Sequence, residues 1–319
     1  MFKDKSIGVV VPAYNEEELI GKVLESMPGF VDRIIVVDDA SQDQTAAVVT
    51  RYEQGLLNGR LSLVRHHKNQ GVGAAIVTGY KQARDEGLDI CGVMAGDFQM
   101  APDDLSAVID PVAQGEADYV KGNRLFSGQS WNLIPHYRYL GNSVLSLLTK
   151  IASGYWHIAD SQSGYTAISL RALQELDLER VFPRYGMPND LLIWLNIHNF
   201  KVKDVQIKPV YNIGERSGIR LRKVIPRISW LLLKGFIRRL FHKYIIQDFH
   251  PLVFFYLFGL VFLLGGAALG LFTLLIDQLE LFDIGYGWMI LGAMLVMSGI
   301  QLTLFAMWFD MDYNKDLKG

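Results

Sequence analysis

Short apolar segments alternate with amphipathic ones over the first third of the chain. The apolar segments are strong at 7–11 and 34–37 and weaker at 61–64 and 90–94, and residues 17–27, 45–52 and 72–83 between them carry apolar positions at helical spacing. Strands that are apolar on both faces and alternate with helices are typical of a parallel sheet covered on both sides. The pattern therefore predicts an α/β fold in which ligands bind beyond the carboxyl ends of the strands.

Residues 100–215 indicate a mixture of helices and strands in less clear order. Helices are expected at 103–112 and 138–153, and a strand is expected at 119–122. The chain has no internal repeat and no low-complexity tract. The α/β pattern is therefore expected to form one domain that ends near residue 215.

Two long segments without charged residues follow, at about 252–276 and 288–309. A helix needs roughly 20 apolar residues to cross the hydrocarbon core of a bilayer, and both segments reach that length. Trp288 and Trp308 lie near the two ends of the second segment, as interfacial aromatic residues do. We expect two transmembrane helices rather than two buried core helices, because two such segments joined by a short acidic loop are rare in soluble domains.

Charge is unevenly distributed although the net charge is only −2. Residues 216–243 contain nine Lys or Arg and no Asp or Glu. Nucleic acid is one partner for such a block. Its position directly before the first apolar segment favours an anionic membrane surface, so no nucleic acid partner is expected. The loop at 277–287 has no Lys or Arg, so the N-terminal domain and the C-terminal tail are expected on the cytoplasmic side of an integral, multi-pass membrane protein.

The segment 223–246 mixes large apolar residues with Lys and Arg at helical spacing. This predicts a basic amphipathic helix, or a helix pair broken near Pro226, that lies in the membrane interface. An ordinary helix packed on the core is the alternative. The chain is thus expected to divide into a domain at 1–215, a juxtamembrane segment at 216–250 and a transmembrane region at 251–319.

Polar residues directly follow the first two apolar segments. The first continues as Val11-Pro-Ala-Tyr-Asn-Glu16, and the second ends in Asp38-Asp39-Ala-Ser41. A carboxylate at the end of the second strand can accept hydrogen bonds from a nucleoside, whereas Ser41 and Asp43 can also simply cap the next helix. The first turn lacks Gly-x-Gly-x-x-Gly, which counts against a dinucleotide-dependent enzyme. The histidines lack the spacing of a zinc site.

Six motifs together carry a resemblance to a known family. They are Val10-Val-Pro-Ala-Tyr-Asn-Glu16, Val36-Val-Asp-Asp-Ala-Ser41, Asn69-Gln-Gly-Val-Gly73, Gly96-Asp-Phe-Gln-Met-Ala-Pro102, Gly122-Asn-Arg124 and Asp160-Ser-Gln-Ser-Gly-Tyr165. The chain resembles the inverting family 2 glycosyltransferases of the GT-A fold, and more narrowly the dolichyl- and polyprenyl-phosphate sugar synthases. The resemblance implies a Rossmann-like mixed sheet flanked by helices, followed by amphipathic interface helices and two transmembrane helices.

The resemblance also implies a nucleotide site. The residues expected to form it are Pro12, Tyr14, Glu16, Asp39, Asn69 and Gly71. Asp39 would contact the base or the ribose, and the backbone at Asn69 and Gly71 would approach the nucleotide. Simple packing is the alternative for Tyr14.

A divalent metal is implied next. Relatives of this kind usually have Asp-x-Asp after the fourth strand, which holds Mg²⁺ or Mn²⁺ against the donor diphosphate. The motif here begins with Ala95 in place of the first Asp, and Asp97 and Gln99 remain as the expected metal ligands. The alternatives are that Asp97 caps the helix after Pro102, or that Ala95 marks a relative that binds a nucleotide sugar without turnover.

The implied acceptor is a lipid phosphate, which is already ionised near neutral pH. Two anions must then be brought together, and this requires cations. Arg124 and Arg138 are the main candidates from the resemblance, with solvated surface arginines as the alternative. Asp160 would orient the acceptor or an arginine, or act as a base towards a hydroxyl acceptor. The weaker candidates are Arg216, Arg220, Arg222 and Asp190.

The leading hypothesis is sugar transfer, with inversion, from a UDP- or GDP-linked sugar to undecaprenyl or dolichyl phosphate at a membrane. The product would serve envelope or protein glycosylation, and the resemblance leaves room for a homo-oligomer. A hydroxyl of another lipid or glycan is the alternative acceptor. The absence of Gln-x-x-Arg-Trp counts against a processive polysaccharide synthase.

Overall fold

The computed structural model describes residues 1–125, 136–208, 221–279 and 286–319, and for 136–140, 142 and 221–224 it describes the backbone alone. The chain forms two compact units. One comprises residues 1–236 with 316–319, and the other comprises residues 237–315.

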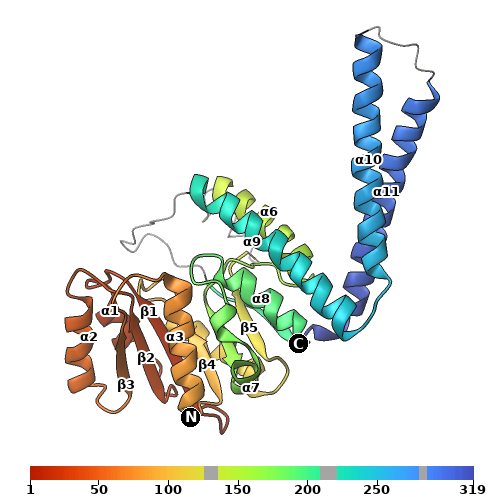
Figure 1. The fold of residues 1–319 in the computed structure, drawn as a ribbon. Helices are drawn as coiled ribbons and strands as arrows, with labels where there is room; N and C mark the ends of the chain where they lie inside the picture. Colours follow the sequence, from red (N-terminus) through yellow and green to blue (C-terminus); the bar gives the residue numbers. More distant parts are fainter. Residues whose placement is uncertain (126–135, 209–220, 280–285) are drawn as a thin grey trace. The chain divides into compact units, whose positions relative to one another are not determined.

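The first unit is built on a seven-stranded sheet in the order β3-β2-β1-β4-β6-β5-β7 (Figure 1). The strands are β1 (Ile7–Ala13), β2 (Arg33–Asp38), β3 (Leu61–Arg65), β4 (Ile90–Val93), β5 (Tyr119–Asn123), β6 (Thr166–Ser169) and β7 (Val202–Gln206). Strands β1 to β4 are parallel, β6 is antiparallel to β4 and β5, and β5 pairs in parallel with β7. The expected mixed sheet is confirmed, and the region of unclear order contributes β6 and β7.

Helices cover both faces of this sheet. They are α1 (Ile20–Glu25), α2 (Thr45–Gln54), α3 (Val72–Asp85), α4 (Leu105–Ala113), α6 (His136–Ser153), α7 (Leu170–Glu175) and α8 (Met187–Ile197), with short turns at Pro102–Asp104 and Leu178–Arg180. Within β1, Val9 and Val11 pack in one core with α1, α2 and α4, whereas Val10 packs in the other with α3, α7 and α8. Alternate residues of one strand thus serve the two cores, which explains why the strand is apolar throughout.

Helix α9 (Leu221–Phe241) is continuous through Pro226, which favours the single helix over the alternative of a helix pair broken there. Pro226 lies in the second turn, where it removes one backbone hydrogen-bond donor without ending the helix. Ile228 and Leu232 pack into the core of the first unit, while Trp230 is 67% exposed. The core-packed interpretation therefore describes one face of α9, and the membrane contact of the exposed face stays a prediction. A short π-helix, His242–Gln247, follows it.

Two long apolar helices, α10 (Leu252–Gln278) and α11 (Gly287–Tyr313), make up most of the second unit. Each has 27 residues, and is therefore about 40 Å long at 1.5 Å per residue, enough to cross a bilayer. Large apolar side chains on both helices, such as Leu264 and Met297, are exposed. The helices are longer than expected, and their exposed surface does not fit the alternative of buried core helices.

Glycines let the backbones of α10 and α11 approach each other closely. Gly266 lies so near α11 that an added Cβ would be 2.7 Å from the carbonyl oxygen of Gly292, and at Gly299 it would be 2.6 Å from the backbone nitrogen of Leu263. The interior of a bilayer is as apolar as the side chains of a helix, so helices there associate through small residues that allow close packing.

We predict opposite effects from alanine at two adjacent glycines. Gly266→Ala should destabilise the hairpin by about 1–3 kcal/mol, because the new methyl group meets backbone atoms that cannot rotate away. Gly265→Ala is the matched control, since a Cβ there meets no atom within 4 Å among the described residues, and alanine favours a helix over glycine. Thermal unfolding of the two variants in detergent, followed by far-UV circular dichroism, measures the difference. Equal midpoints would contradict the close packing.

Candidate active site

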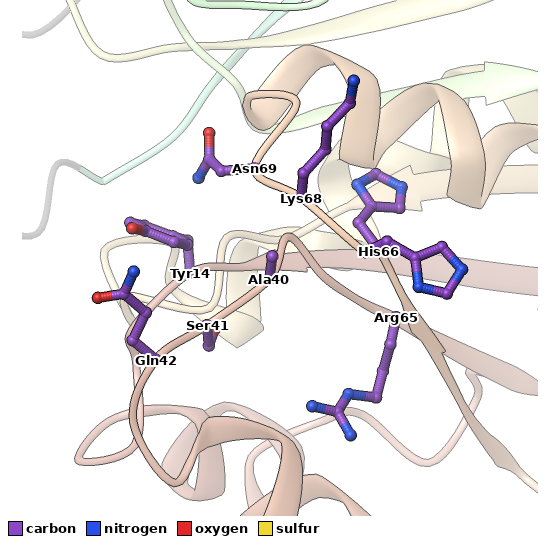
Figure 2. Close-up of a pocket in the computed structure, with 9 residues that line it drawn as sticks. Tyr14, Ala40, Ser41, Gln42, Arg65, His66, Lys68 and Asn69 are labelled. Carbon is purple, nitrogen blue, oxygen red and sulfur yellow. The ribbon is translucent and has the colours of Figure 1, made fainter.

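The loops after β1 and β2 are joined by hydrogen bonds at the carboxyl edge of the sheet. The Asp39 N–H donates to the Ala13 carbonyl at 2.9 Å, and the Asn15 N–H donates to the Ser41 hydroxyl at 3.0 Å. Asn15 and Ala40 adopt left-handed backbone conformations, with φ of +57° and +62°. These turns leave Tyr14 43% exposed, beside Ala40 and Ser41 (Figure 2).

Asp39 fastens the loop that follows β3. One of its oxygens accepts the Gln70 N–H at 2.9 Å and lies 2.7 Å from His66 Nδ1, and the other accepts the Gly71 N–H at 2.8 Å. His66 Nε2 lies 2.9 Å from the Thr78 hydroxyl on α3. Asp39 is 3% exposed, so the geometry assigns it to holding the loop at 66–71. Its expected contact with the base or ribose stays a prediction.

These loops enclose an open cleft of about 680 Å³ (Figure 2), within the size range of small-molecule sites. It is lined by Tyr14, Ala40, Ser41, Gln42, Arg65, His66, His67, Lys68 and Asn69. Of the expected nucleotide residues, Tyr14 and Asn69 line it, whereas Pro12, Glu16, Asp39 and Gly71 are outside this lining. The basic residues Arg65 and Lys68 were missed, although they directly follow the strand expected at 61–64 and the carboxyl-end rule applies to them equally.

Asp97 lies beside the end of β1. The Gly96 N–H donates to the Pro12 carbonyl at 3.1 Å, and Phe98 turns the chain with φ of +61°. An Asp97 carboxylate oxygen accepts the Gln99 N–H at 3.1 Å. The side chain therefore closes its own turn, and the structure does not support the alternative that it caps the helix after Pro102, where no capping side-chain bond is found.

Glu16 adds a second carboxylate near Asp97. Burial, Asp97 and Asp43 together raise the pKa of Glu16 to about 7. Carboxylates that repel each other in this way suit a hard cation with oxygen ligands. Among the described residues, no three His, Cys, Asp or Glu side chains are close enough to hold a metal by themselves. A cation bound at Asp97, Gln99 and Glu16 would therefore need further oxygens, which a diphosphate and water supply.

Arg124 and Asp160 form a two-pronged ion pair at the end of β5. Arg124 Nε lies 2.8 Å and Nη2 3.2 Å from the two carboxylate oxygens, and the Arg124 N–H also donates to Asp160 at 3.2 Å. Asp160 is fully buried. Although burial favours its protonated form, Arg124 and Lys121 hold the pKa of Asp160 below its usual range. Of the roles left open for Asp160, orienting an arginine fits this geometry best.

Asp190 anchors a segment that packs against Gly71 of the loop after β3. It is buried in the first turn of α8 and accepts the Phe182 N–H at 2.9 Å. The next residue, Pro183, accepts the Ala74 N–H of α3 at 2.9 Å and lies against Gly71. Gly71 has φ of +104°, and a Cβ there would be 2.7 Å from the Pro183 oxygen, so this position requires glycine.

The remaining arginine candidates are only partly described. Arg138 lies in α6 and Arg222 in α9, and their side chains are outside the description. Arg216 and Arg220 lie outside the described residues altogether. Their expected contacts with phosphate stay predictions.

Comparison with known proteins identifies the family of the chain. Residues 8–177 match the family described as Glycosyl transferase family 2. A relative from Methanococcus voltae, named UDP-N-acetylglucosamine--dolichyl-phosphate N-acetylglucosaminyltransferase, is 34% identical over 65% of this chain and 87% of its own length. Polyprenol monophosphomannose synthase of Mycolicibacterium smegmatis is 28% identical over 71% of this chain and 87% of its own.

A solved structure supports the fold. Glucosyl-3-phosphoglycerate synthase from Mycobacterium tuberculosis, in complex with Mn²⁺, uridine diphosphate and glucosyl-3-phosphoglycerate, has a TM-score of 0.55 and 21% identity over 74% of this chain and 80% of that one. At this identity the likeness establishes the GT-A-like arrangement of the sheet and its helices.

We predict that Glu16 makes the protein less stable as the pH rises. The folded state raises its pKa from the ordinary 4.5 to about 7, so between these values the folded protein keeps a proton that the unfolded chain releases. Stability should fall across that window as the pH increases. Glu16→Gln should remove this loss, whereas Glu18→Gln, at an exposed neighbour, should not. Thermal midpoints from pH 5 to 7, in EDTA, test it, and parallel curves for all three proteins would contradict it.

Proposed function

The chain belongs to glycosyl transferase family 2 and is a glycosyltransferase, and we propose that it transfers a sugar, with inversion, from a nucleotide diphosphate sugar to polyprenyl phosphate. The observation that carries the proposal is the position of one site at the carboxyl edge of the sheet, in a chain that also has two helices long and apolar enough to cross a bilayer. Relatives whose names state this reaction support it.

The donor proposed first is UDP-linked N-acetylglucosamine. The relative whose name states this donor is 34% identical, compared with 28% for the mannose synthase. Tyr14 would cover the base, and Arg65 and Lys68, which line the same cleft, would bring positive charge to it. A polar cleft of this kind suits an anionic nucleotide.

Asp97, Gln99 and Glu16 would hold Mg²⁺ or Mn²⁺, and Glu16 would supply the second carboxylate that Ala95 lacks. The cation would neutralise charge on the leaving diphosphate. Glu16 is partly buried and lies close enough to Asp97 for the two carboxylates to repel each other.

The acceptor phosphate needs no strong base, because it is already ionised. Its oxygen would attack the anomeric carbon directly, while Arg124, and Arg138 from α6, offset the negative charge. Asp160, ionised and paired, would keep the Arg124 guanidinium in place.

The membrane is the proposed partner of residues 216–250 and 251–319, with 1–215 as the transferase domain. Leu233, Ile237 and Phe241 of α9 are exposed together with Trp230, on a helix that also carries Lys and Arg. We propose a multi-pass protein whose catalytic domain faces the cytoplasm, since the basic segment precedes α10 and the loop at 277–287 has no Lys or Arg.

The first experiment offers the purified protein UDP- and GDP-linked sugars with polyprenyl phosphate, in Mn²⁺, Mg²⁺ or EDTA. We expect radiolabel from UDP-N-acetylglucosamine to enter the lipid fraction and the transfer to be lost in EDTA. Transfer from another donor would replace the sugar assignment. No label in the lipid fraction with any donor would refute the proposed acceptor, and a diacylglycerol or glycan acceptor would be tried next.

Asp97→Asn should lower kcat/KM for transfer by roughly 100-fold, because it removes a charged ligand that stabilises the leaving group. Asp103→Asn is the matched control, since Asp103 is an exposed carboxylate on the following turn. Initial rates at several Mn²⁺ concentrations measure the effect. If Asp97→Asn, like Asp103→Asn, has the wild-type rate in excess Mn²⁺ and the wild-type affinity for Mn²⁺, Asp97 is not a metal ligand.

A further inference from the structure

Lys121 and Asp204 are charged residues of adjacent strands inside the sheet. Lys121 of β5 is in register with Asp204 of β7. Lys121 is fully buried, and one Asp204 carboxylate oxygen is buried without a hydrogen-bond partner among the described residues. Neither residue was identified from the sequence, although a lysine within the strand expected at 119–122 was a visible signal.

Together the two side chains hold both ends of the loop that carries Asp160. Asp204 Oδ2 accepts the Ala159 N–H at 2.6 Å, directly before Asp160. Lys121 Nζ donates to the Ser163 carbonyl at 2.7 Å, at the other end of the loop. The loop therefore cannot move relative to β5 and β7 without breaking a buried charged hydrogen bond.

Asp204 also fixes the strand end that carries Arg124. The same oxygen accepts Nδ2–H of Asn123 at 3.2 Å, and Asn123 Oδ1 accepts the Leu125 N–H at 2.9 Å across Arg124. One carboxylate thus contacts the residue before Asp160 and the residue before Arg124. The position of the Asp204 carboxylate therefore sets the distance between Arg124 and Asp160.

Burial disfavours the charged forms of both Lys121 and Asp204. Burial lowers the pKa of Lys121 and raises that of Asp204, and the attraction between opposite charges opposes both shifts. The charged groups that act on this pair are Asp160, Arg124 and Lys150 of α6. Charged groups at such depth contribute little net stability compared with apolar residues of similar size, even where opposite charges attract each other. A positional role explains why charge is placed here.

We propose that Lys121 and Asp204 are positioning residues for the transfer step: they hold the Arg124–Asp160 pair at the spacing that sugar transfer requires. This inference rests on the proposed function of that pair. It predicts an effect on turnover and none on the nucleotide cleft, which is built from the loops after β1, β2 and β3.

The test compares Asp204→Ala with Asp118→Ala. Asp118 also joins β5 to the β7 side, since it accepts the Lys201 N–H at 3.0 Å, but it lies at the opposite end of β5 from Arg124. Asp204→Ala removes the oxygen that accepts the Ala159 and Asn123 N–H groups and should lower kcat by about 10- to 100-fold, as misplacement of reacting groups does, with the Kd for UDP-sugar unchanged by calorimetry. Asp118→Ala should leave kcat within twofold of wild type. Equal kcat for Asp204→Ala and wild type would overturn the proposal.

Asp204→Asn provides the rescue. The oxygen of the asparagine amide can take the position of Asp204 Oδ2 and accept both the Ala159 N–H and the Asn123 Nδ2–H, so both bonds return without the charge. We expect the kcat of Asp204→Asn to lie within about threefold of wild type, and a kcat as low as that of Asp204→Ala, with intact donor binding, would refute the positional role. If Asp204→Ala does not fold, Asn123→Ser, which removes one of the two bonds, should give an intermediate loss, and a wild-type kcat would refute the role.

The kinetics use whichever acceptor the donor-and-acceptor experiment identifies. Failure of wild-type transfer to polyprenyl phosphate would therefore count against the proposed acceptor. If the wild type is active and Asp204→Ala has the same kcat, the result would count against the positioning role.

Discussion

Buried carboxylates that accept backbone N–H groups hold the loops at the carboxyl edge of the sheet, and the geometry of the site depends on them. Asp39 fastens the loop after β3, and Asp160 and Asp204 fasten the end of β5 and the loop beside it. Loop amides have no strand or helix partner, and a buried charge needs several donors to be tolerated. Each carboxylate meets both requirements at once, so the loops are ordered while Tyr14 and Arg65 stay open to a ligand.

The second unit also contains a buried carboxylate that several donors surround. Arg239 and Asp310 are both fully buried and form two hydrogen bonds, of 2.7 and 3.0 Å, and Tyr244 and Asn314 add further bonds to Asp310. A buried ion pair is tolerable when its remaining donors and acceptors are satisfied in this way. Along the rest of α10 and α11, contact depends on glycines and close backbone approach, which is the way helices pack inside a bilayer.

The carboxyl-end rule predicted that the polar residues after the parallel strands lie at one edge of the sheet, and the family resemblance named Tyr14, Asn69 and Asp97 among them. In the structure Tyr14 and Asn69 line the cleft, and Asp97 lies near Glu16. The rule did not show that Asp39 is taken up by the loop after β3, since this depends on how that loop folds back. Lys121 and Asp204 were also missed, because their proximity comes from the pairing of β5 with β7.

By itself the sequence determined the strands and helices of the first hundred residues and the two segments long enough to cross a membrane, because these follow from the spacing of apolar residues along the chain. It also determined the family, through six motifs spread from β1 to residue 165. Only the tertiary structure decided the order β4-β6-β5-β7 and the partner of each buried charge. The reason is physical: the energy of a charge inside a protein is set by neighbours that are distant in sequence, and no local pattern records them.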